Sequence, residues 1–461
     1  RYKKITSGCR QEFMFRKSFL LLLLMAAMVA PGVVLAQGGI RPPKLNYTTA
    51  KLPNGLTVVL SEDHSTPIVH LQLWYHVGSK NERPGRTGFA HLFEHLMFKG
   101  SKNVDSEEHI TMISGIGGET NATTNEDTTI FWETVPAHYL PVILWLEADR
   151  MADLRIDQRT LDAEVEIVKE ERRMRVDNQP FGRLNEIIYD QAFTVHPYKH
   201  PVIGSMEDLE AASVEDVHEF YETYYVPENA TLVLVGDFDS EEALKLTARY
   251  LGAVPKANHP VPRDILMEPH QEQERRVTLE EDWPLPVVVV AHPIIYDGHP
   301  DSYPLHVASK ILSDGQSARL HRKLVYEEQV AIGAFGAGNI IEHPNLFYAV
   351  AMVQPGRTPS EAEAALIAEL EQLKKEPVSE AELRRAKNQF ARDYIIGRES
   401  NQQKAGHLAH AAVIHNDIKT ADGEFDIFTN IKAEDVQRVA QTYFNSQSRL
   451  VIHILPKAQV Q

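Results

Sequence analysis

Two stretches of the sequence decide the fold: EDVHEFYETYYVPENATLVLV at residues 215–235 and EDVQRVAQTYFNSQSRLVIHI at residues 434–454. Each begins with Glu-Asp-Val, continues to a threonine followed by an aromatic pair, and ends in an apolar run. The spacing from Glu-Asp-Val to the aromatic pair is the same in both copies, which lie 219 residues apart. A shared order of helix, aromatic pair and strand predicts a duplicated domain.

The rest of the chain has the pattern of antiparallel strands followed by runs of helices. A hairpin is expected at Asn54-Gly55, because this dipeptide favours the tight turns that join antiparallel strands. The other predicted elements of the first half are strands at 68–77, 128–135 and 230–237 and helices at 88–99, 138–152, 160–176 and 213–224. In the second half, a strand at 287–291 and a helical region from 309 restart the pattern. The predicted fold class is α+β, with two similar domains that each pack helices on an antiparallel or mixed β-sheet.

A stretch rich in proline, histidine and charged residues separates the two halves. Residues 253–275 include Val254-Pro255, His259-Pro260 and Pro262-Arg263, which is typical of a linker. We therefore predict an N-terminal domain at 37–258, a linker at 259–275 and a C-terminal domain at 276–461.

The amino terminus has the pattern of a secretory signal peptide. Arg16-Lys17 precedes an apolar run at 19–30, and Val34-Leu35-Ala36 forms a small-residue cleavage site. We expect residues 1–36 to comprise an extension upstream of Met14 and this signal peptide, so that the mature chain is exported, for example to the periplasm. An uncleaved membrane anchor is the alternative.

Composition and charge exclude several classes of protein. The 461 residues are 43% hydrophobic and 24% charged, which excludes a disordered, collagen-like or multi-span membrane protein. The formal net charge of -17 argues against a nucleic-acid partner, because phosphate binding needs a basic surface. The one cysteine, Cys9, precedes the cleavage site, and no later segment is apolar enough to span a bilayer, so no stable membrane anchor is expected after cleavage.

The candidate chemistry of the chain lies in His91-Leu92-Phe93-Glu94-His95. On a helix, His91 and His95 are four residues apart and share one face, with Glu94 beside them. The apolar residues on the other side would pack on a sheet, and Thr87 would cap the helix. Two imidazoles at this spacing suit zinc, which needs a third protein ligand and leaves one position for water.

A second predicted helix supplies carboxylates. Its buried stripe consists of Leu161, Val165 and Val168. Glu164 and Glu171 flank this stripe on the same side, whereas Glu166 and Glu170 point to solvent. An acid at the rim of a buried face needs a partner, because burying an unpaired charge is costly. Glu171 is thus a better candidate than Glu170 for the third ligand. The carboxylate of Glu164 fits a supporting role, in which it orients one of the ligating imidazoles.

Each of these patterns also has an explanation that involves no metal site. With 21 histidines and 64 acidic residues, the five-residue motif also arises by chance, and the acidic helix could be a solvated face. Two other histidine pairs fit metal binding less well. Pro197 and Pro201 argue against a helix that would place His196 and His200 on one face. His407 and His410 have no obvious carboxylate partner, so packing or surface roles are favoured there.

The motif together with the distant glutamate resembles the zinc signature of the pitrilysin/insulinase family of inverted-motif zinc peptidases. The chain is similar above all to the family's half-length members and to the β subunit of the mitochondrial processing peptidase. The resemblance extends over nearly the whole mature chain. It rests on His91-x-x-Glu94-His95, Ile167-Val168-x-x-Glu171, Leu52-Pro53-Asn54-Gly55-Leu56, Gly118-x-x-Asn121-Ala122-x-Thr124, His196-Pro197-Tyr198 and Asp237.

This resemblance implies a zinc endopeptidase that acts on extended peptides. His91, His95 and Glu171 would bind one Zn2+ ion, and Glu94 would activate a water molecule. Asn121 and Ala122 would lie on the edge strand to which a peptide substrate adds as a further strand. Two similar domains would form half of a chamber, so that two chains would enclose a substrate.

The second half departs from the pattern of the family. Full-length members carry an arginine and, seven residues later, a tyrosine that hold the substrate, whereas Val325 and Ile332 stand at those positions here. Arg322 and Tyr326 are nearby at the wrong spacing. We therefore expect a sister chain of the same fold to supply the Arg/Tyr pair in a heterodimer, with a homodimer as the alternative. A non-catalytic structural subunit and a peptide-binding chamber are the rival functions.

Overall fold

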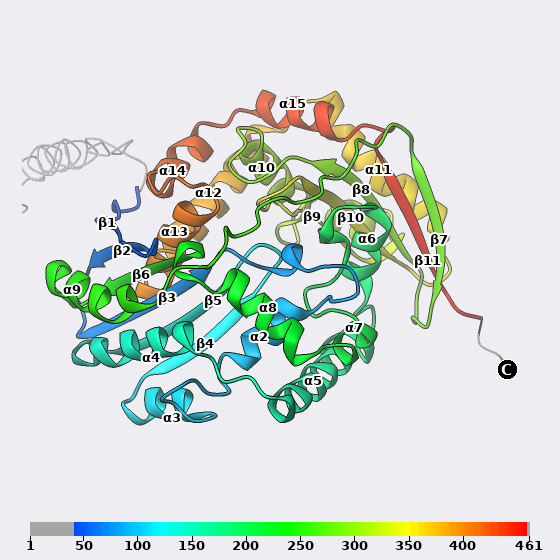
Figure 1. Cartoon of the computed structure of the whole chain (residues 1–461). Coiled ribbons are helices and arrows are strands. Elements are labelled where there is room, and N and C mark those ends of the chain that lie inside the picture. Colours follow the sequence, from blue (N-terminus) through cyan, green and yellow to red (C-terminus); the bar gives the residue numbers. More distant parts are fainter. Residues whose placement is uncertain (1–40, 459–461) are drawn as a thin grey trace, which may run out of the picture. The chain divides into compact units, whose positions relative to one another are not determined.

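Two mixed β-sheets organise the computed structural model, which describes residues 41–458 (Figure 1). The predicted signal peptide at 1–36 lies outside the described residues. The first sheet has the strand order β1-β2-β6-β3-β5-β4, and the second has the order β7-β11-β8-β10-β9. The strands of the first sheet are β1 (Thr48–Lys51), β2 (Thr57–Glu62), β3 (Ile68–Tyr75), β4 (Glu119–Thr124), β5 (Thr129–Pro136) and β6 (Ala230–Gly236). Those of the second are β7 (Arg275–Glu281), β8 (Val287–Ile294), β9 (Ala331–Gly338), β10 (Asn345–Val353) and β11 (Leu450–Pro456).

The two sheets share one topology, apart from the additional edge strand β1 of the first sheet. In the first, β6 runs parallel to β2 and antiparallel to β3, and in the second, β11 runs parallel to β7 and antiparallel to β8. The repeated helices α8 (Val214–Tyr224) and α15 (Ala433–Tyr443) are each 11 residues long. The predicted α+β fold of two similar halves is therefore confirmed. The predicted hairpin also forms, because β1 pairs with β2 through a turn in which Gly55 has a φ of 98°.

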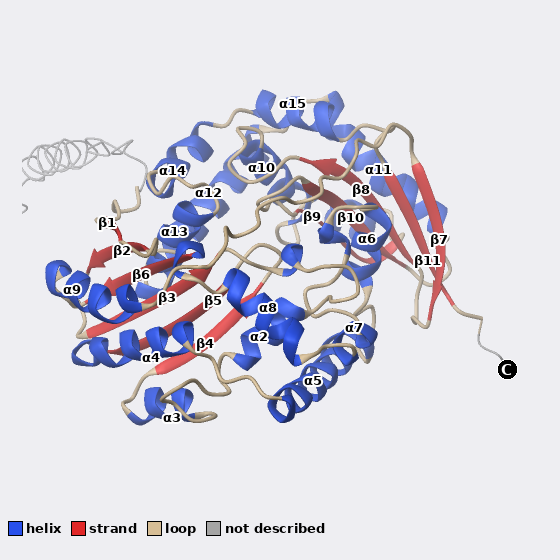
Figure 2. Ribbon diagram, in the orientation of Figure 1, coloured by secondary structure: helices blue, strands red, loops and turns tan. Residues whose placement is uncertain are grey.

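Helices pack against both sheets (Figure 2). The remaining helices are α2 (Phe89–Leu96), α3 (Glu108–Gly115), α4 (Leu140–Ala152), α5 (Gln158–Arg172), α6 (Leu184–Ala192), α7 (Met206–Glu210), α9 (Ser240–Tyr250), α10 (Ser302–Ser313), α11 (Pro359–Lys375), α12 (Glu380–Ile396), α13 (Asn401–Val413) and α14 (Thr420–Asn430). Residues 254–274 connect the halves without a helix or strand. Within the described residues, no helix combines the length and the apolar character needed to cross a membrane.

Each half contributes a helix to the sheet of the other half. Helix α13, from the second half, packs on β3 and β6, and its Leu408 lies in one buried cluster with Val233. Helix α6, from the first half, places Ile188 in a buried cluster with Val289 of β8. Because helices cover both faces of β8, the run 287–291 is apolar and buried at every position. Neither half has a complete core without the other.

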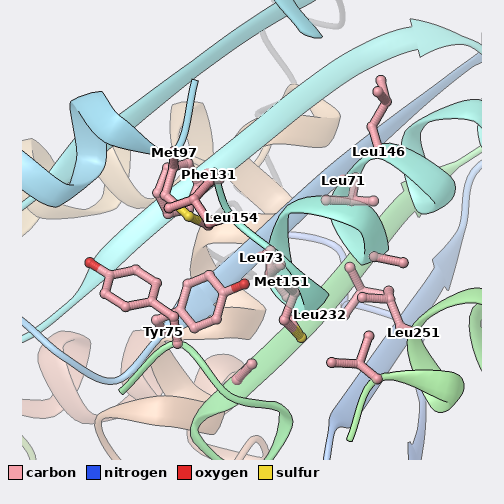
Figure 3. Packing of buried hydrophobic residues seen from close by; sticks show 14 of the residues in the cluster. Leu71, Leu73, Tyr75, Met97, Phe131, Leu146, Met151, Leu154, Leu232 and Leu251 are labelled. Carbon is pink, nitrogen blue, oxygen red and sulfur yellow. The ribbon is translucent and has the colours of Figure 1, made fainter. Parts of the chain in front are cut away.

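The inner face of the first sheet forms a large apolar core with the helices of its own half (Figure 3). Leu73 of β3, Phe131 of β5 and Leu232 of β6 are fully buried there. Met151 of α4 and Met97, at the end of α2, pack in the same cluster. Burial of each such side chain contributes about 1.5–3 kcal/mol, so the sheet holds α2 firmly in place.

A buried polar cluster, hereafter the inter-half cluster, joins loops of the two halves. Lys80 Nζ lies 2.9 Å from Asp127 Oδ1 and also pairs with Glu342, while His76 Nε2 lies 2.7 Å from Glu342 Oε2. The Glu342 amide and the Tyr198 hydroxyl both donate hydrogen bonds to Asp127, at 3.1 and 2.6 Å. Burial alone would raise the pKa of Glu342, but the contacts with His76 and Lys80 lower this pKa to about 2.

Replacement of Glu342 tests the inter-half cluster. We expect Glu342→Gln to lower the free energy of unfolding by about 2–3 kcal/mol at pH 7, because Lys80 and His76 lose a buried partner. Since the folded pKa lies below the usual value of 4.5, this stabilisation is present above pH 4.5 and is lost as the pH falls towards 2. Urea unfolding at pH 7 and pH 3 measures both effects.

The exposed Glu222 of α8 provides the control, since Glu222→Gln should leave the urea midpoint almost unchanged. Equal urea midpoints for the wild-type chain and Glu342→Gln at pH 7 would contradict a stabilising role of the inter-half cluster.

Candidate metal centre

Helix α2, which contains both histidines of the motif, begins at a glycine in a left-handed conformation. Gly88 has a φ of 89°, and a Cβ atom there would lie 2.7 Å from the carbonyl oxygen of Ile203. The buried Glu82 caps the helix, because its carboxylate accepts hydrogen bonds from the amides of Gly88 (2.9 Å) and Ala90 (2.7 Å). The prediction that Thr87 caps this helix is wrong, since the Thr87 hydroxyl donates to Asp208 instead.

The apolar side of α2 determines which way the histidines face. Leu92, Phe93 and Leu96 are buried in the core of the first half. The ring of Phe93 lies 4.1 Å from the ring of Tyr225, measured between centroids. With this side packed inward, the helical periodicity places the motif's imidazoles and carboxylate together on the opposite side.

Helix α5 presents the acidic residues in the predicted way. Asp157 caps the helix by accepting a hydrogen bond from the Thr160 amide at 2.8 Å. The side chains of Glu164 and Glu171 are 4% and 17% exposed, whereas those of Glu166 and Glu170 are 66% and 58% exposed. The structure thus agrees with the division of this helix into a facing pair and a solvated pair of glutamates.

Three side chains from α2 and α5 converge on one point. The Nε2 atoms of His91 and His95 lie 3.8 and 3.5 Å from Glu171 Oε2. The other carboxylate oxygen of Glu171 pairs with Arg175 at 2.5 Å, so only Oε2 is directed at the imidazoles. Burial, together with the charges of His95 and Arg175, lowers the pKa of His91 to about 4, which keeps this imidazole neutral and able to bind a metal.

Glu164 orients the second imidazole. Its Oε2 lies 3.4 Å from His95 Nδ1, and its Oε1 lies 3.0 Å from Lys99 Nζ. Burial opposes ionisation of Glu164, but the contacts with His95 and Lys99 outweigh burial and hold its pKa below the usual value. A carboxylate at Nδ1 favours the tautomer with its proton there, which leaves the lone pair of His95 Nε2 facing Glu171.

The three convergent atoms fit a zinc ion by donor type and by spacing. Two neutral imidazole nitrogens and one carboxylate oxygen are donors typical of zinc sites with an open position. Ligands about 2.0–2.1 Å from a tetrahedral ion lie roughly 3.3–3.4 Å apart. The observed separations of 3.5 and 3.8 Å are close to this value, so small movements would complete the coordination.

Glu94 lies on the same face of α2 as the two histidines. The hydroxyl of Thr124, at the end of β4, donates a 2.6 Å hydrogen bond to Glu94 Oε2. Burial raises the pKa of Glu94, and the hydrogen bond from Thr124 only partly opposes this effect. Glu94 is thus held by one oxygen, and burial makes its carboxylate a stronger base than an exposed glutamate.

The predicted substrate residues lie at the edge of the first sheet. Strand β4 pairs with β5 on one side only, and Asn121 and Ala122 are in its middle. The amide of Ala122 donates to Asn121 Oδ1 at 2.8 Å. The structure therefore places both residues on an edge strand, close in sequence to Thr124, which contacts Glu94.

Other candidate groups do not form a metal centre with these residues. His196 accepts a hydrogen bond from the Tyr198 amide at 3.0 Å, whereas His200 lies beside Glu82, so this pair does not converge. His109, Glu133 and Glu147 are also close together and buried, but Arg150 already pairs with both carboxylates.

Sequence reasoning missed several residues that support the centre. Glu82 has no signal of its own, because its role depends on loop geometry. Arg175 had one, since it lies four residues after Glu171 on the predicted helix at 160–176. Lys99 had one, since it lies four residues after His95 and thus near the same helix face. Thr124 belongs to a quoted motif, but its hydrogen bond to Glu94 needed the tertiary structure.

Two family models match the chain. The model described as insulinase (peptidase family M16) matches residues 57–205, which include every residue of the candidate centre. The model described as peptidase M16 inactive domain matches residues 211–390. The second match begins within the first half, before α8, and continues into the second half.

Proteins of similar sequence and structure span nearly the whole described chain. The zinc protease PqqE of Helicobacter pylori is 30% identical over 413 residues, which cover 89% of this chain and 93% of that protein. The crystal structure of a protease from Helicobacter pylori matches with a TM-score of 0.85 at 30% identity, over 90% of this chain and 100% of that chain. The periplasmic protease PqqL of Escherichia coli matches with a TM-score of 0.73 at 18% identity, over 90% of this chain but 48% of PqqL.

Glutamine substitutions on α5 test the geometry of the centre. We expect Glu171→Gln to remove one equivalent of zinc per chain, whereas the matched, exposed Glu170→Gln should leave the zinc content unchanged. Glu164→Gln should weaken binding by about 10–100-fold, because the orientation of His95 is lost. Elemental analysis after dialysis at defined free zinc measures the effect. Equal zinc loss at Glu170 and Glu171 would contradict the assignment of the helix faces.

Proposed function

The chain belongs to the insulinase family of peptidases (peptidase family M16), and we propose that it is a zinc metalloendopeptidase that hydrolyses extended oligopeptides or unfolded polypeptides. The observation that carries the proposal is the convergence of His91, His95 and Glu171 beside Glu94. Relatives named zinc proteases support the metal and the reaction class.

The side chains of the centre suit peptide hydrolysis by general base catalysis. His91, His95 and Glu171 would hold the ion, which when bound lowers the pKa of water and polarises a peptide carbonyl. Thr124 occupies Glu94 Oε2, so Oε1 is the oxygen that accepts the proton of the attacking water. The same carboxyl group then donates this proton to the leaving amine. No serine or cysteine nucleophile takes part.

Strand β4 accounts for the proposed preference for extended substrates. A peptide that adds to this edge strand is held through its backbone, with little dependence on its sequence. In the free chain, the side chain of Asn121 accepts a hydrogen bond from the Ala122 amide. When a peptide binds, this side chain would rotate away, so that the Ala122 amide can donate to the peptide backbone. Folded proteins offer few free extended segments, which favours unfolded polypeptides as substrates.

Replacement of Glu94 tests the reaction. We expect Glu94→Gln to lower kcat by about 10²–10⁴-fold on a quenched peptide while the zinc content stays at the wild-type level, because the general base is lost but no ligand is. Glu170→Gln, on an exposed position of α5, is the matched control and should keep its turnover. Near-full turnover by a zinc-loaded Glu94→Gln chain would contradict the role of Glu94, and an inactive wild-type chain with zinc bound would favour a structural subunit.

We also propose that the chain is exported and acts with a second chain of the same fold. Val325 and Ile332 stand where family members carry the Arg/Tyr pair, Arg322 pairs with Glu327, and Tyr326 is exposed. PqqL, which is described as periplasmic, is about twice as long as the matched part of this chain and so has room for two such units. A sister chain with the Arg/Tyr pair would supply the missing donors.

If a sister chain supplies the Arg/Tyr pair, the isolated chain should hydrolyse peptides only slowly. A hydrogen-bond donor to the developing oxyanion is worth about 10²–10³-fold in rate, so addition of the sister chain should raise turnover by that amount. Turnover and mass in solution are measured for the chain alone and after mixing with a sister chain encoded by the same genome. Full activity of a homodimer, with no gain on mixing, would contradict the heterodimer.

A further inference from the structure

A second group of metal-ligating side chains lies in the other half of the molecule. Asp297 follows β8, His410 is on α13, and His415 lies just beyond the end of that helix. The Nε2 atoms of His410 and His415 are 3.1 and 3.3 Å from the same oxygen, Asp297 Oδ2. Among the described residues, these three and the catalytic centre are the groups that combine two histidines with one carboxylate.

The end of α13 brings the two histidines together. Residues five apart on a continuous helix point in different directions, so His410 and His415 would not meet if the helix continued. Helix α13 ends at Val413, and the Asp417 amide donates back to the carbonyl of Ala411 at 3.1 Å. Asn416 has a φ of 50°, which completes the reversal. The two imidazole rings then lie 5.0 Å apart.

The hydrogen bonds around His415 identify its free nitrogen. The Thr420 hydroxyl donates to the carbonyl of Asp417 at 2.8 Å, so its oxygen accepts a hydrogen bond from His415 Nδ1, also at 2.8 Å. A neutral imidazole has one N–H, and this bond places it on Nδ1. In a neutral His415, Nε2 therefore carries a lone pair. This nitrogen is buried and lies 3.3 Å from Asp297 Oδ2 without a well-aligned hydrogen bond, in a side chain that is only 4% exposed.

The carboxylate opposite this lone pair directs one of its oxygens at both imidazoles. Asp297 Oδ1 accepts a hydrogen bond from the Gly298 amide at 2.8 Å, which leaves Oδ2 directed at the imidazoles. A lone pair and a carboxylate oxygen 3.3 Å apart repel each other unless a cation lies between them. Such a cation is either a proton that makes the imidazole positive or a metal ion.

We propose that Asp297, His410 and His415 bind a second divalent transition-metal ion, with Zn2+ as the ion that suits two imidazoles and a carboxylate. The separations of 3.1 and 3.3 Å are close to the roughly 3.3 Å between ligands of a tetrahedral zinc ion. Glu424 lies in the same region, where burial raises the pKa of its carboxyl group. His410 is 44% exposed, which gives the ion access from solvent and leaves a position for water.

The position of the site in the fold indicates a structural role. Asp297 extends from the second sheet, whereas α13 packs on β3 and β6 of the first sheet. An ion held by Asp297, His410 and His415 would therefore tie the end of α13, which packs on the first sheet, to the segment that follows β8 of the second sheet. This role is independent of peptide hydrolysis.

Zinc binding by the full-length chain tests the site. After removal of metal with a chelator, we expect the wild-type chain to bind two equivalents of Zn2+, and His410→Ala and Asp297→Asn to bind one, as measured by titration calorimetry and elemental analysis. The exposed Asp417→Asn, in the same turn, is the matched control and should bind two. Zinc should raise the thermal unfolding midpoint of Glu171→Gln, which keeps only the second site, but not that of Glu171→Gln combined with His410→Ala.

These measurements separate the second site from the proposed peptidase. Failure of the catalytic centre to bind zinc would reduce the wild-type stoichiometry to one and that of His410→Ala to none. Equal zinc content of the wild-type chain, His410→Ala and Asp297→Asn would overturn the second site and favour a protonated His–Asp–His cluster. A zinc-dependent thermal shift that survives in the double variant would overturn it as well.

Discussion

The packing of helix α2 is the constraint on which the candidate centre depends. Its apolar side is buried against the first sheet and α8, where Phe93 lies beside Tyr225. That burial leaves α2 one free side, directed at α5, and the helical repeat brings His91, Glu94 and His95 onto it. Glu171 can then face both imidazoles at once, because α5 presents a narrow apolar stripe to α2 and keeps its acids at the rim. A rotation of either helix would separate the three donors.

The second half repeats this arrangement without the metal-binding residues. Helix α10 follows β8 as α2 follows β3, and α12 packs on α10 as α5 packs on α2. Between α10 and α12, Lys310 Nζ lies 2.8 Å from Asp393 Oδ2, so an ion pair stands where the first half brings imidazoles to a carboxylate. One fold therefore supports a candidate metal centre in one half and a structural contact in the other. The exchange of α6 and α13 makes each half necessary for the core of its neighbour.

The sequence by itself predicted the elements whose physics is local. The 3.6-residue repeat of α-helices was sufficient to place His91 and His95 on one side of α2 and to separate Glu171 from Glu170. The repeated pattern ending in the strands β6 and β11 was sufficient to predict the duplication, because hydrophobic periodicity reports burial directly. The run 287–291 also indicated a strand. In each case the predicted feature belongs to a single helix or strand, whose residues are neighbours in the chain.

Tertiary structure alone decided which distant groups meet. Glu82, and not Thr87, caps α2, because the loop before the helix folds back over its first turn. Asp297 meets His410 and His415 because α13 ends and reverses at a point that helical periodicity does not reveal. Glu342 closes the inter-half cluster from the other half of the chain. Local sequence preferences determine the helices and strands and which of their faces are apolar. Long-range contacts depend on how these elements pack against one another, and no single stretch of sequence specifies that packing.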